Sequence, residues 1–449
     1  MDRHDADLGT PQDQPISRRC LLKGMGAGTF AVGASGLLAA CSSGLKGGGN
    51  ATAGGAINIG FITPLTGVLA GFASGDKYVL SQISQTSAYK QGIKVGSKSY
   101  KVNIVVKDSQ SSPTRATQVA LQLITQNHVD LVLTTSTPET TNPVATVCER
   151  RHTPCLSTVV PWESWYVGLG GNPLSPTKKF QYCTMFFFGL KEFEGCFVPM
   201  WNRITNNKVV ACQYPNDADG NAFRLGFEPL IKASGYKVVD GGPYTDLATD
   251  FTSMIRQFKN KHAEVFSNSP LPPDFNVFWK QASQQGFKPK IATVAKVLLF
   301  PADTVALGPL VNNIATDSWW GPYMPNSSSL SGVSAKALAD GYQAATGNQW
   351  VQSIGSSYAL FEVAKEAFTQ VSDPHDAAEV ASALHHVSYT GMCGALNFQT
   401  GPAPGVGIIN PVGVQWKKST GQFPFEMLVV DNNLNPAVKI QAKLEPTNA

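Results

Sequence analysis

The chain has 449 residues and a net charge of +4, with 43% apolar and 15% charged residues. This length suffices for two domains with full cores, and the composition is typical of a globular protein. The charge excludes a nucleic-acid footprint, because Lys and Arg are few and do not cluster in the body of the chain.

The first forty residues predict an export signal. The twin arginines Arg18 and Arg19 precede a Gly- and Ala-rich apolar stretch that is too short and too weak to remain as a membrane span. We therefore expect residues 1–40 to be a twin-arginine signal; the alternative is an ordinary N-terminal core helix. Leu38-Ala39-Ala40-Cys41 resembles a bacterial lipoprotein cleavage box, which implies that Cys41 is lipidated.

A flexible tether is expected to follow the signal. Residues 41–55 are rich in Gly, Ser and Ala and carry no apolar pattern by which they could pack. No later run is long enough to cross a bilayer. The body of the protein is therefore expected to be extracytoplasmic and held to the cell membrane by lipid.

The body opens with alternating strands and helices. Pro64 and Gly67 end the first strand in a turn. This alternation predicts a parallel sheet wrapped by helices. The expected strands cover 57–62, 100–108, 129–134 and 153–161, with helices from 76, at 114–127 and from 138.

The same pattern restarts after a junction near 180–195, so we expect two similar lobes. Its strands are expected at 208–213, 237–240, 263–267 and 290–297, with a polar turn at 216–221 and helices at 222–234, 250–261 and 274–285. Two helices, at 335–346 and 356–371, and two late strands, at 389–398 and 413–417, complete the series.

Several segments resemble one family. Ile-Gly-Phe-Ile-Thr-Pro-Leu-Thr-Gly at 59–67 and the Gly-x-Leu-x-Phe strand at 394–398 are similar to extracytoplasmic solute-binding proteins of ABC importers, in the branch for branched-chain amino acids and amides. The resemblance spans roughly 56–420. It implies the type I periplasmic binding protein fold, in which two Rossmann-like α/β lobes with parallel central sheets are joined by a three-crossing hinge.

The resemblance also implies where the chain passes between the lobes. The crossings are expected near 182, 321 and 389. Lobe 1 would then comprise 56–182 plus 322–389, and lobe 2 would comprise 183–321 plus 390–449.

The turn at Ser136 and Thr137 is one candidate ligand site. Hydroxyls and free backbone N–H groups at a helix start favour an anion, and in the resembled family this turn holds the amino-acid carboxylate. Simple helix capping is the alternative. The resemblance also places Phe72 where the family often has an aromatic residue over the ligand side chain.

A second candidate site follows the fourth strand. The resemblance places Val159 and Pro161 where amino-acid binders offer small residues and a hydroxyl, and Trp162 comes next. This departure argues against a simple α-amino-acid ligand. Trp162 either faces the ligand or belongs to the core of the lobe.

The second lobe supplies further candidates. Asp217 and Ala218 lie where the family usually has Tyr-Gly-x-Gly. The Asp-x-Asp-Gly sequence at this turn is similar to a calcium loop but lacks its bidentate Glu, so we expect no metal. Lys296 replaces the acid that amino-acid binders carry; we hypothesise that it meets an acidic or carbonyl group of the ligand, and a snorkelling lysine is the alternative. Trp319 and Trp320, at the second crossing, indicate an aromatic cleft suited to flat or apolar ligands.

Cysteine pairing stays open. Cys20 leaves with the signal, and an even set of six in an exported chain favours disulfides, although fifteen pairings are possible. Cys148–Cys155 and Cys183–Cys196 are two candidates, and buried free thiols are the alternative. The six are Cys148, Cys155, Cys183, Cys196, Cys212 and Cys393.

The motifs favour a binding protein over an enzyme. We find no nucleophile elbow, phosphate loop or dinucleotide motif in the body, and no cofactor is expected. The expected mechanism is closure of two lobes on one small solute (an amino acid, an amide, or an aromatic or acidic solute) and docking on an ABC permease. A ligand-sensing lipoprotein of the same fold that signals to a separate partner, or a surface enzyme with an unrecognised site, are the alternatives.

Overall fold

The computed structural model describes residues 52–447, which belong to one compact unit. The expected signal 1–40, Cys41 and the tether as far as residue 51 lie outside the described residues. The last part of the expected tether is already structured, because Thr52 and Ala53 pair with the strand that contains Lys98 and Ser99. Among the described residues, no helix combines the length and the apolar character needed to cross a membrane.

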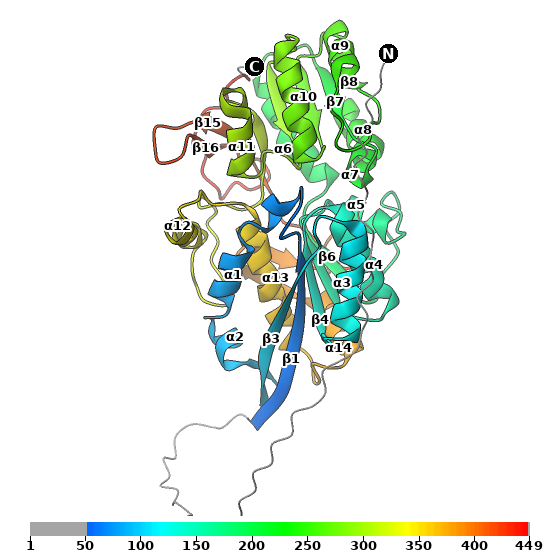
Figure 1. Cartoon of the computed structure of the whole chain (residues 1–449), viewed down its shortest axis with the longest axis vertical. Coiled ribbons are helices and arrows are strands. Elements are labelled where there is room, and N and C mark those ends of the chain that lie inside the picture. The colour runs from blue at the N-terminus through cyan, green and yellow to red at the C-terminus, as the bar shows by residue number, and fades with distance from the viewer. Residues whose placement is uncertain (1–51, 448–449) are drawn as a thin grey trace, which may run out of the picture. The chain divides into compact units, whose positions relative to one another are not determined.

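The first lobe is built on a seven-stranded sheet (Figure 1). Its strands are β1 (Thr52–Thr63), β2 (Ile93–Val95), β3 (Lys98–Asp108), β4 (Leu131–Thr135), β5 (Cys155–Thr158), β6 (Cys183–Phe186) and β14 (Val406–Gly407). Their order across the sheet is β14-β6-β5-β4-β1-β3-β2, and every pair is parallel except β2 with β3. All five residues of β4 are buried, as expected for a central strand covered on both faces.

Helices cover both faces of this sheet. α3 and α4 pack together against β1, β4 and β5, whereas α13 packs on the other side, with α1 and α14 beside it (Figure 1). α3 begins where the Ser112 side chain accepts a hydrogen bond from the Arg115 N–H, with Pro113 at its first position. The helices of this lobe are η1 (Ala70–Ala73), α1 (Asp76–Ile83), α2 (Ser87–Gln91), α3 (Pro113–Thr125), α4 (Pro138–Arg150), α5 (Trp162–Gly168), α12 (Ala335–Thr346), α13 (Ser353–Phe368) and α14 (Ala377–His386).

The second lobe repeats the architecture. Its strands are β7 (Val209–Gln213), β8 (Lys237–Asp240), β9 (Val265–Asn268), β10 (Ile291–Val294), β11 (Ala315–Ser318), β15 (Val412–Lys418) and β16 (Phe425–Asp431). Their order is β16-β15-β11-β10-β9-β7-β8, with β15 and β16 antiparallel to their neighbours. Its helices are α6 (Leu190–Arg203), α7 (Ala218–Ala222), η2 (Phe223–Phe227), α8 (Glu228–Ala233), α9 (Thr252–Asn260), α10 (Pro272–Gln284), α11 (Pro301–Leu307) and η3 (Gly308–Val311).

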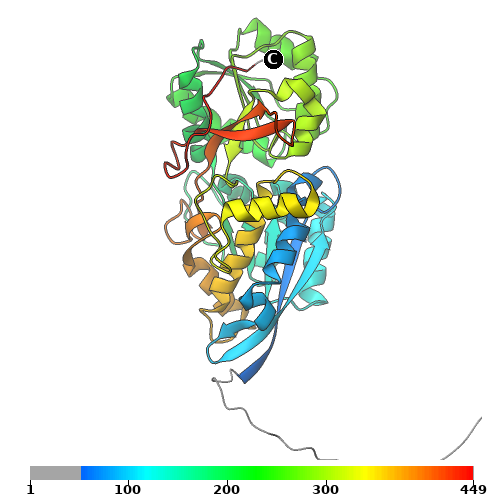
Figure 2. The same ribbon diagram turned by 90° about the vertical axis from the view of Figure 1, so that its left-hand side faces the viewer.

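These two lobes confirm the predicted fold class, but two crossings come later in the chain than expected. β6 still pairs with β5, so the first crossing follows Phe186 rather than residue 182. β14 pairs with β6, so the third crossing lies after Gly407 rather than near 389. Residues 183–186 and 406–407 form the last two strands at one edge of the first sheet, so the chain leaves the first lobe only after each of them. After residue 407 it enters the second sheet at β15 (red in Figure 2).

Most predicted elements lie within a few residues of their observed bounds. The segment 389–398 is different, because it folds as a hairpin of β12 (Ser388–Gly391) and β13 (Gly394–Asn397) rather than as one strand. The expected polar turn at 216–221 contains the start of α7, and the stretch after Pro161 forms α5. Several elements were not predicted, among them α2, β2, β6, α6, α11, β11, β14 and β16.

Candidate functional site

A cavity lies between the carboxyl ends of the strands of the two lobes, where open α/β sheets bind ligands. Its volume is about 30 Å³, and the empty space that includes the part open to solvent is about 380 Å³. The first lobe contributes four lining residues from the loops that follow β1, β4 and β5, and the others come from the crossings and the second lobe. The lining residues are Phe72, Thr137, Val159, Pro161, Phe187, Phe193, Asp219, Phe223, Ser269, Ala295, Lys296, Leu299, Asp317 and Trp319.

Three residues that follow strand ends at this cavity have a positive φ. Ser136 has φ 143°, Val159 has φ 63° and Lys296 has φ 67°. Side chains rarely adopt this region, and for a β-branched valine it is costly. Such positions persist where the surrounding structure holds them, and these three are turns that border the cavity.

The turn between β4 and α4 brings hydroxyls to the first-lobe side. Thr137 lines the cavity and precedes Pro138 at the start of α4, while Ser136 lies behind it and is fully buried. Within the described residues, neither the Ser136 Oγ nor the Thr137 Oγ1 has a hydrogen-bond partner. Glu139 occupies the first turn of the helix and already supplies a negative charge there.

Lys296 lies at the centre of an ion-pair cluster. Its Nζ is 2.9 Å from Asp219 Oδ2, 3.1 Å from Asp217 Oδ2 and 3.3 Å from Glu139 Oε1. Burial alone would favour the neutral amine, but these three carboxylates raise the pKa of Lys296 well above its ordinary value. An acidic ligand group of the kind we hypothesised would therefore compete with three carboxylates for this ammonium.

Asp219 also joins the lobes. Its Oδ1 accepts a hydrogen bond of 2.8 Å from the Ser164 hydroxyl on α5, so the carboxylate is shared between a first-lobe serine and Lys296. Burial, with Glu139 and Asp217 nearby, raises its pKa to about 7 in spite of the lysine. Asp217 instead caps α7, because its side chain accepts a hydrogen bond from the Gly220 N–H.

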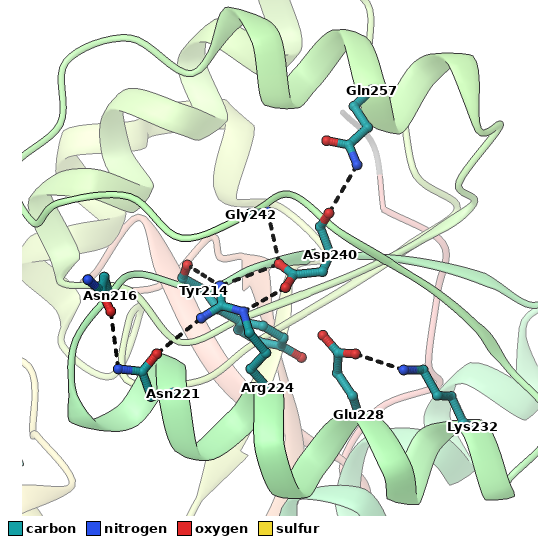
Figure 3. Close-up of polar contacts among 9 residues, drawn as sticks. All are labelled: Tyr214, Asn216, Asn221, Arg224, Glu228, Lys232, Asp240, Gly242 and Gln257. Atoms are coloured by element: carbon teal, nitrogen blue, oxygen red, sulfur yellow. Dashed lines mark hydrogen bonds and ion pairs between the residues drawn. The ribbon is translucent and has the colours of Figure 1, made fainter.

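Residues on either side of Asp217 and Asp219 in the chain make further polar contacts (Figure 3). The Arg224 guanidinium donates to the Tyr214 carbonyl at 2.9 Å and forms an ion pair with Asp240 at 2.6 Å. The Asn221 amide donates to the Asn216 side chain. These contacts fix both ends of the loop, so Asp217 and Asp219 are presented to Lys296 by a rigid support.

Asp317 lies at the end of β11 and is 2% exposed. It lines the cavity, and its Oδ1 has no hydrogen-bond partner among the described residues. Burial raises its pKa to about 7. This carboxyl group, two residues before Trp319, was missed by the sequence reasoning because its short strand, Ala-Thr-Asp-Ser, carries no apolar pattern.

Aromatic side chains form much of the remaining wall. Trp319 lies edge to face with Phe187 at 5.1 Å between ring centroids, and Phe72 does the same with Phe300 of the second lobe at 4.8 Å. Phe193 and Phe223 add a further pair from α6 and η2. These last two were not singled out, because an aromatic residue in a helix is more often part of a core.

The predicted site residues divide into two groups. Phe72, Thr137, Val159, Pro161, Lys296 and Trp319 line the cavity, whereas Ser136, Trp162, Asp217, Ala218 and Trp320 do not.

Two tryptophans of the second group pack elsewhere. Trp320 packs against α13, where a side-chain carbon at Gly355 would come within 2.1 Å of its ring. Trp162 packs on Gly189 at the first crossing, where a side-chain carbon would come within 2.3 Å of its ring. The roles of both groups in binding remain proposals.

The six cysteines of the body are buried and unpaired in the structure, which corresponds to the alternative of free thiols. Cys155 lies opposite Cys183 on adjacent strands. Neither candidate disulfide, Cys148–Cys155 or Cys183–Cys196, is formed among the described residues.

Comparison with known proteins agrees with this geometry. The family model described as "Periplasmic binding protein" matches residues 56–408. A leucine binding protein from Thermotoga maritima has a similar structure, with a TM-score of 0.67, 17% identity, and coverage of 85% of this chain and 99% of that one.

Two further solved structures share the fold. One is a branched-chain amino acid transporter substrate binding protein from Streptococcus pneumoniae in complex with isoleucine, with a TM-score of 0.64, 17% identity, and coverage of 87% of this chain and 99% of that one. The other is an ABC transporter solute binding protein from Rhodopseudomonas palustris in complex with 3,4-dihydroxy benzoic acid, with a TM-score of 0.63, 17% identity, and coverage of 86% and 98%. At this identity the likeness establishes the fold.

Proposed function

Because the chain belongs to the periplasmic binding protein family, we propose that it is an extracytoplasmic solute-binding protein that encloses one small organic solute and delivers it to an ABC importer. The observation that carries this proposal is the cavity between the carboxyl ends of the two sheets, with lining residues from both lobes and from two crossings. The similar proteins named above are solute-binding proteins of ABC transporters or bind amino acids, which supports the same role.

The proposed mechanism is non-catalytic. Solute enters between the lobes, the lobes close over it, and the closed form is the one that the permease recognises. Contacts from Lys296 to Glu139 and from Ser164 to Asp219 join the lobes beside the cavity, so they support a closed form that the protein itself stabilises.

The proposed location rests on the N-terminal sequence. Twin arginines Arg18 and Arg19 direct export, and lipid on Cys41 anchors the body to the outer face of the cell membrane. Labelling of cells with a radioactive fatty acid is expected to mark the wild-type protein, whereas Cys41→Ser is expected to stay unlabelled. Equal labelling of both proteins would contradict the anchor.

Binding is tested by thermal shift on the full-length chain in detergent, against amino acids, amides, aromatic acids and amines. Tight binding raises the melting temperature by mass action. X-ray scattering of the protein with and without each solute that gives a shift then reports closure as a smaller radius of gyration. Shifts without any change in scattering would contradict enclosure between lobes.

A further inference from the structure

The charged groups around the cavity are unbalanced. Among the residues that line it, Lys296 is the one basic side chain, and its ammonium is already shared by Glu139, Asp217 and Asp219. Asp317 adds another carboxyl group to the lining. One ammonium therefore faces four carboxyl groups, two of which line the cavity, and the surplus of charge around the cavity is negative.

In the described part of the chain, Asp317 is the carboxyl group of this set that is left without a partner at the cavity. Its side chain is almost fully buried, yet its Oδ1 has no partner among the described residues. An unpaired carboxylate in such a place is expensive, and the cost is removed by a cation that both neutralises it and donates a hydrogen bond. The nearest aromatic neighbour along the chain, Trp319, also lines the cavity.

The walls around this carboxyl group suit a cation as well. Five aromatic side chains line the cavity, and the face of an aromatic ring attracts a positive charge, that of tryptophan most strongly. They also offer apolar surface for a hydrocarbon body. The five are Phe72, Phe187, Phe193, Phe223 and Trp319.

We infer that the cavity takes a compact organic ammonium ion, whose nitrogen meets the Asp317 carboxylate while its apolar body lies against the aromatic walls. This inference rests on the proposed solute-binding function and narrows its ligand class. An anionic solute is disfavoured, because Lys296 is already paired and Asp317 would repel it. Binding of a ligand carboxylate at the start of α4 is disfavoured too, because Glu139 already supplies a negative charge in that turn.

The test compares solutes that share a skeleton and differ in charge. Calorimetric titration of the full-length chain at pH 8 uses phenethylamine, 2-phenylethanol, phenylalanine and 3-phenylpropanoate, and then isoamylamine, isoamyl alcohol, leucine and 4-methylpentanoate. We expect the amine of at least one series to bind at least tenfold more tightly than its neutral, zwitterionic and anionic relatives. The inference is overturned if neither amine binds, or if in both series a neutral, zwitterionic or anionic relative binds as tightly as its amine or more tightly.

A pair of matched variants locates the recognition. Asp317→Asn keeps the shape of the side chain and is expected to weaken amine binding at least tenfold, leaving the neutral alcohol unaffected. Asp303→Asn is the control: Asp303 on α11 is half-buried, its Oδ2 is buried without a partner among the described residues and its pKa is raised by burial to about 7, but it does not line the cavity. We expect it to bind amines like the wild type.

The outcomes separate this inference from the proposed function. If Asp317→Asn is unfolded, the charge series on the wild-type protein still decides the ligand class. Binding of anions or zwitterions with lobe closure would overturn the ammonium ligand and leave the solute-binding function standing. An amine preference that Asp317→Asn and Asp303→Asn both retain in full would overturn the role of Asp317.

Discussion

Lys296 Nζ lies 3.3 Å from Glu139 Oε1, and this ion pair joins the two lobes. The lysine follows β10 of the second lobe, and the glutamate lies in the first turn of α4 of the first. Within its own lobe the lysine keeps two other carboxylates, from Asp217 and Asp219. The contact with Glu139 is therefore the part of the cluster that opening of the cleft would break.

Glu139→Gln is expected to shift the protein toward an open form. The amide keeps the size of the side chain but loses the charge, so the closed form loses an attraction that the open form lacks. We expect solute affinity to fall about three- to tenfold, with a larger radius of gyration in scattering without solute. Asp340→Asn breaks the exposed Lys336–Asp340 pair and serves as the control. Equal affinities for Glu139→Gln and the wild type would refute a role in closure.

Gly220→Ala is expected to disrupt the loop that presents Asp217 and Asp219. A side-chain carbon at Gly220 would lie 2.2 Å from the Pro215 carbonyl oxygen, which belongs to the backbone and has little freedom to move. The loop must shift, and we expect a loss of about 1 to 3 kcal/mol of stability together with weaker solute binding.

Gly226→Ala is the control for that substitution. Its added carbon meets the end of the flexible Leu190 side chain at 2.5 Å, which can turn aside. Urea unfolding and calorimetric titration measure both effects. If both variants behave alike, the close approach at Gly220 does not position the aspartates.

Stability is expected to decrease as the pH rises from about 4 to 7. Asp76 is buried between β1 and α13, where it accepts hydrogen bonds from Thr63 and Ser357, and burial raises its pKa from 3.8 to about 7. In this window the unfolded chain has lost the proton that the folded protein keeps, so deprotonation favours unfolding. For Asp76 alone the loss is up to about 4 kcal/mol.

Urea unfolding at pH 5, 6, 7 and 8 measures this dependence. Asp76→Asn removes one of the titrating groups and is expected to make the curve less steep, whereas Asp340→Asn on the surface of α12 is expected to follow the wild type. A wild-type protein that is more stable at pH 8 than at pH 5 would refute the prediction.

The sequence predicts more of the fold than of the site. The alternating Ile57, Ile59 and Phe61 of β1 mark a strand by local pattern alone, and so do the apolar residues of α3 at helical spacing. The cluster around Lys296 depends instead on segments 157 and 79 residues away in the chain, at Glu139 and Asp217, which only the folded sheets bring together. The spacing of residues within one segment does not predict contacts between residues so far apart in the chain.

Two of the three crossings were misplaced for a related reason. β14 has two residues, Val406 and Gly407, and its pairing with β6 is what keeps the segment before it in the first lobe. A strand this short has no periodicity to detect. Asp317 was overlooked in the same way, because β11 has four residues and every one of them is buried.

Trp319 and Trp320 offer a direct optical test of where solute binds. They are adjacent in the chain, but Trp319 lines the cavity against Phe187, whereas Trp320 is fully buried and packs edge to face with Trp350 at 6.2 Å. A solute that binds in the cavity changes the surroundings of Trp319 directly. We expect the change in tryptophan fluorescence on solute addition to shrink by more than half in Trp319→Phe and to persist in Trp320→Phe. Phenylalanine keeps an aromatic ring at each position, so both variants should fold. The opposite pattern would place the solute outside the cavity.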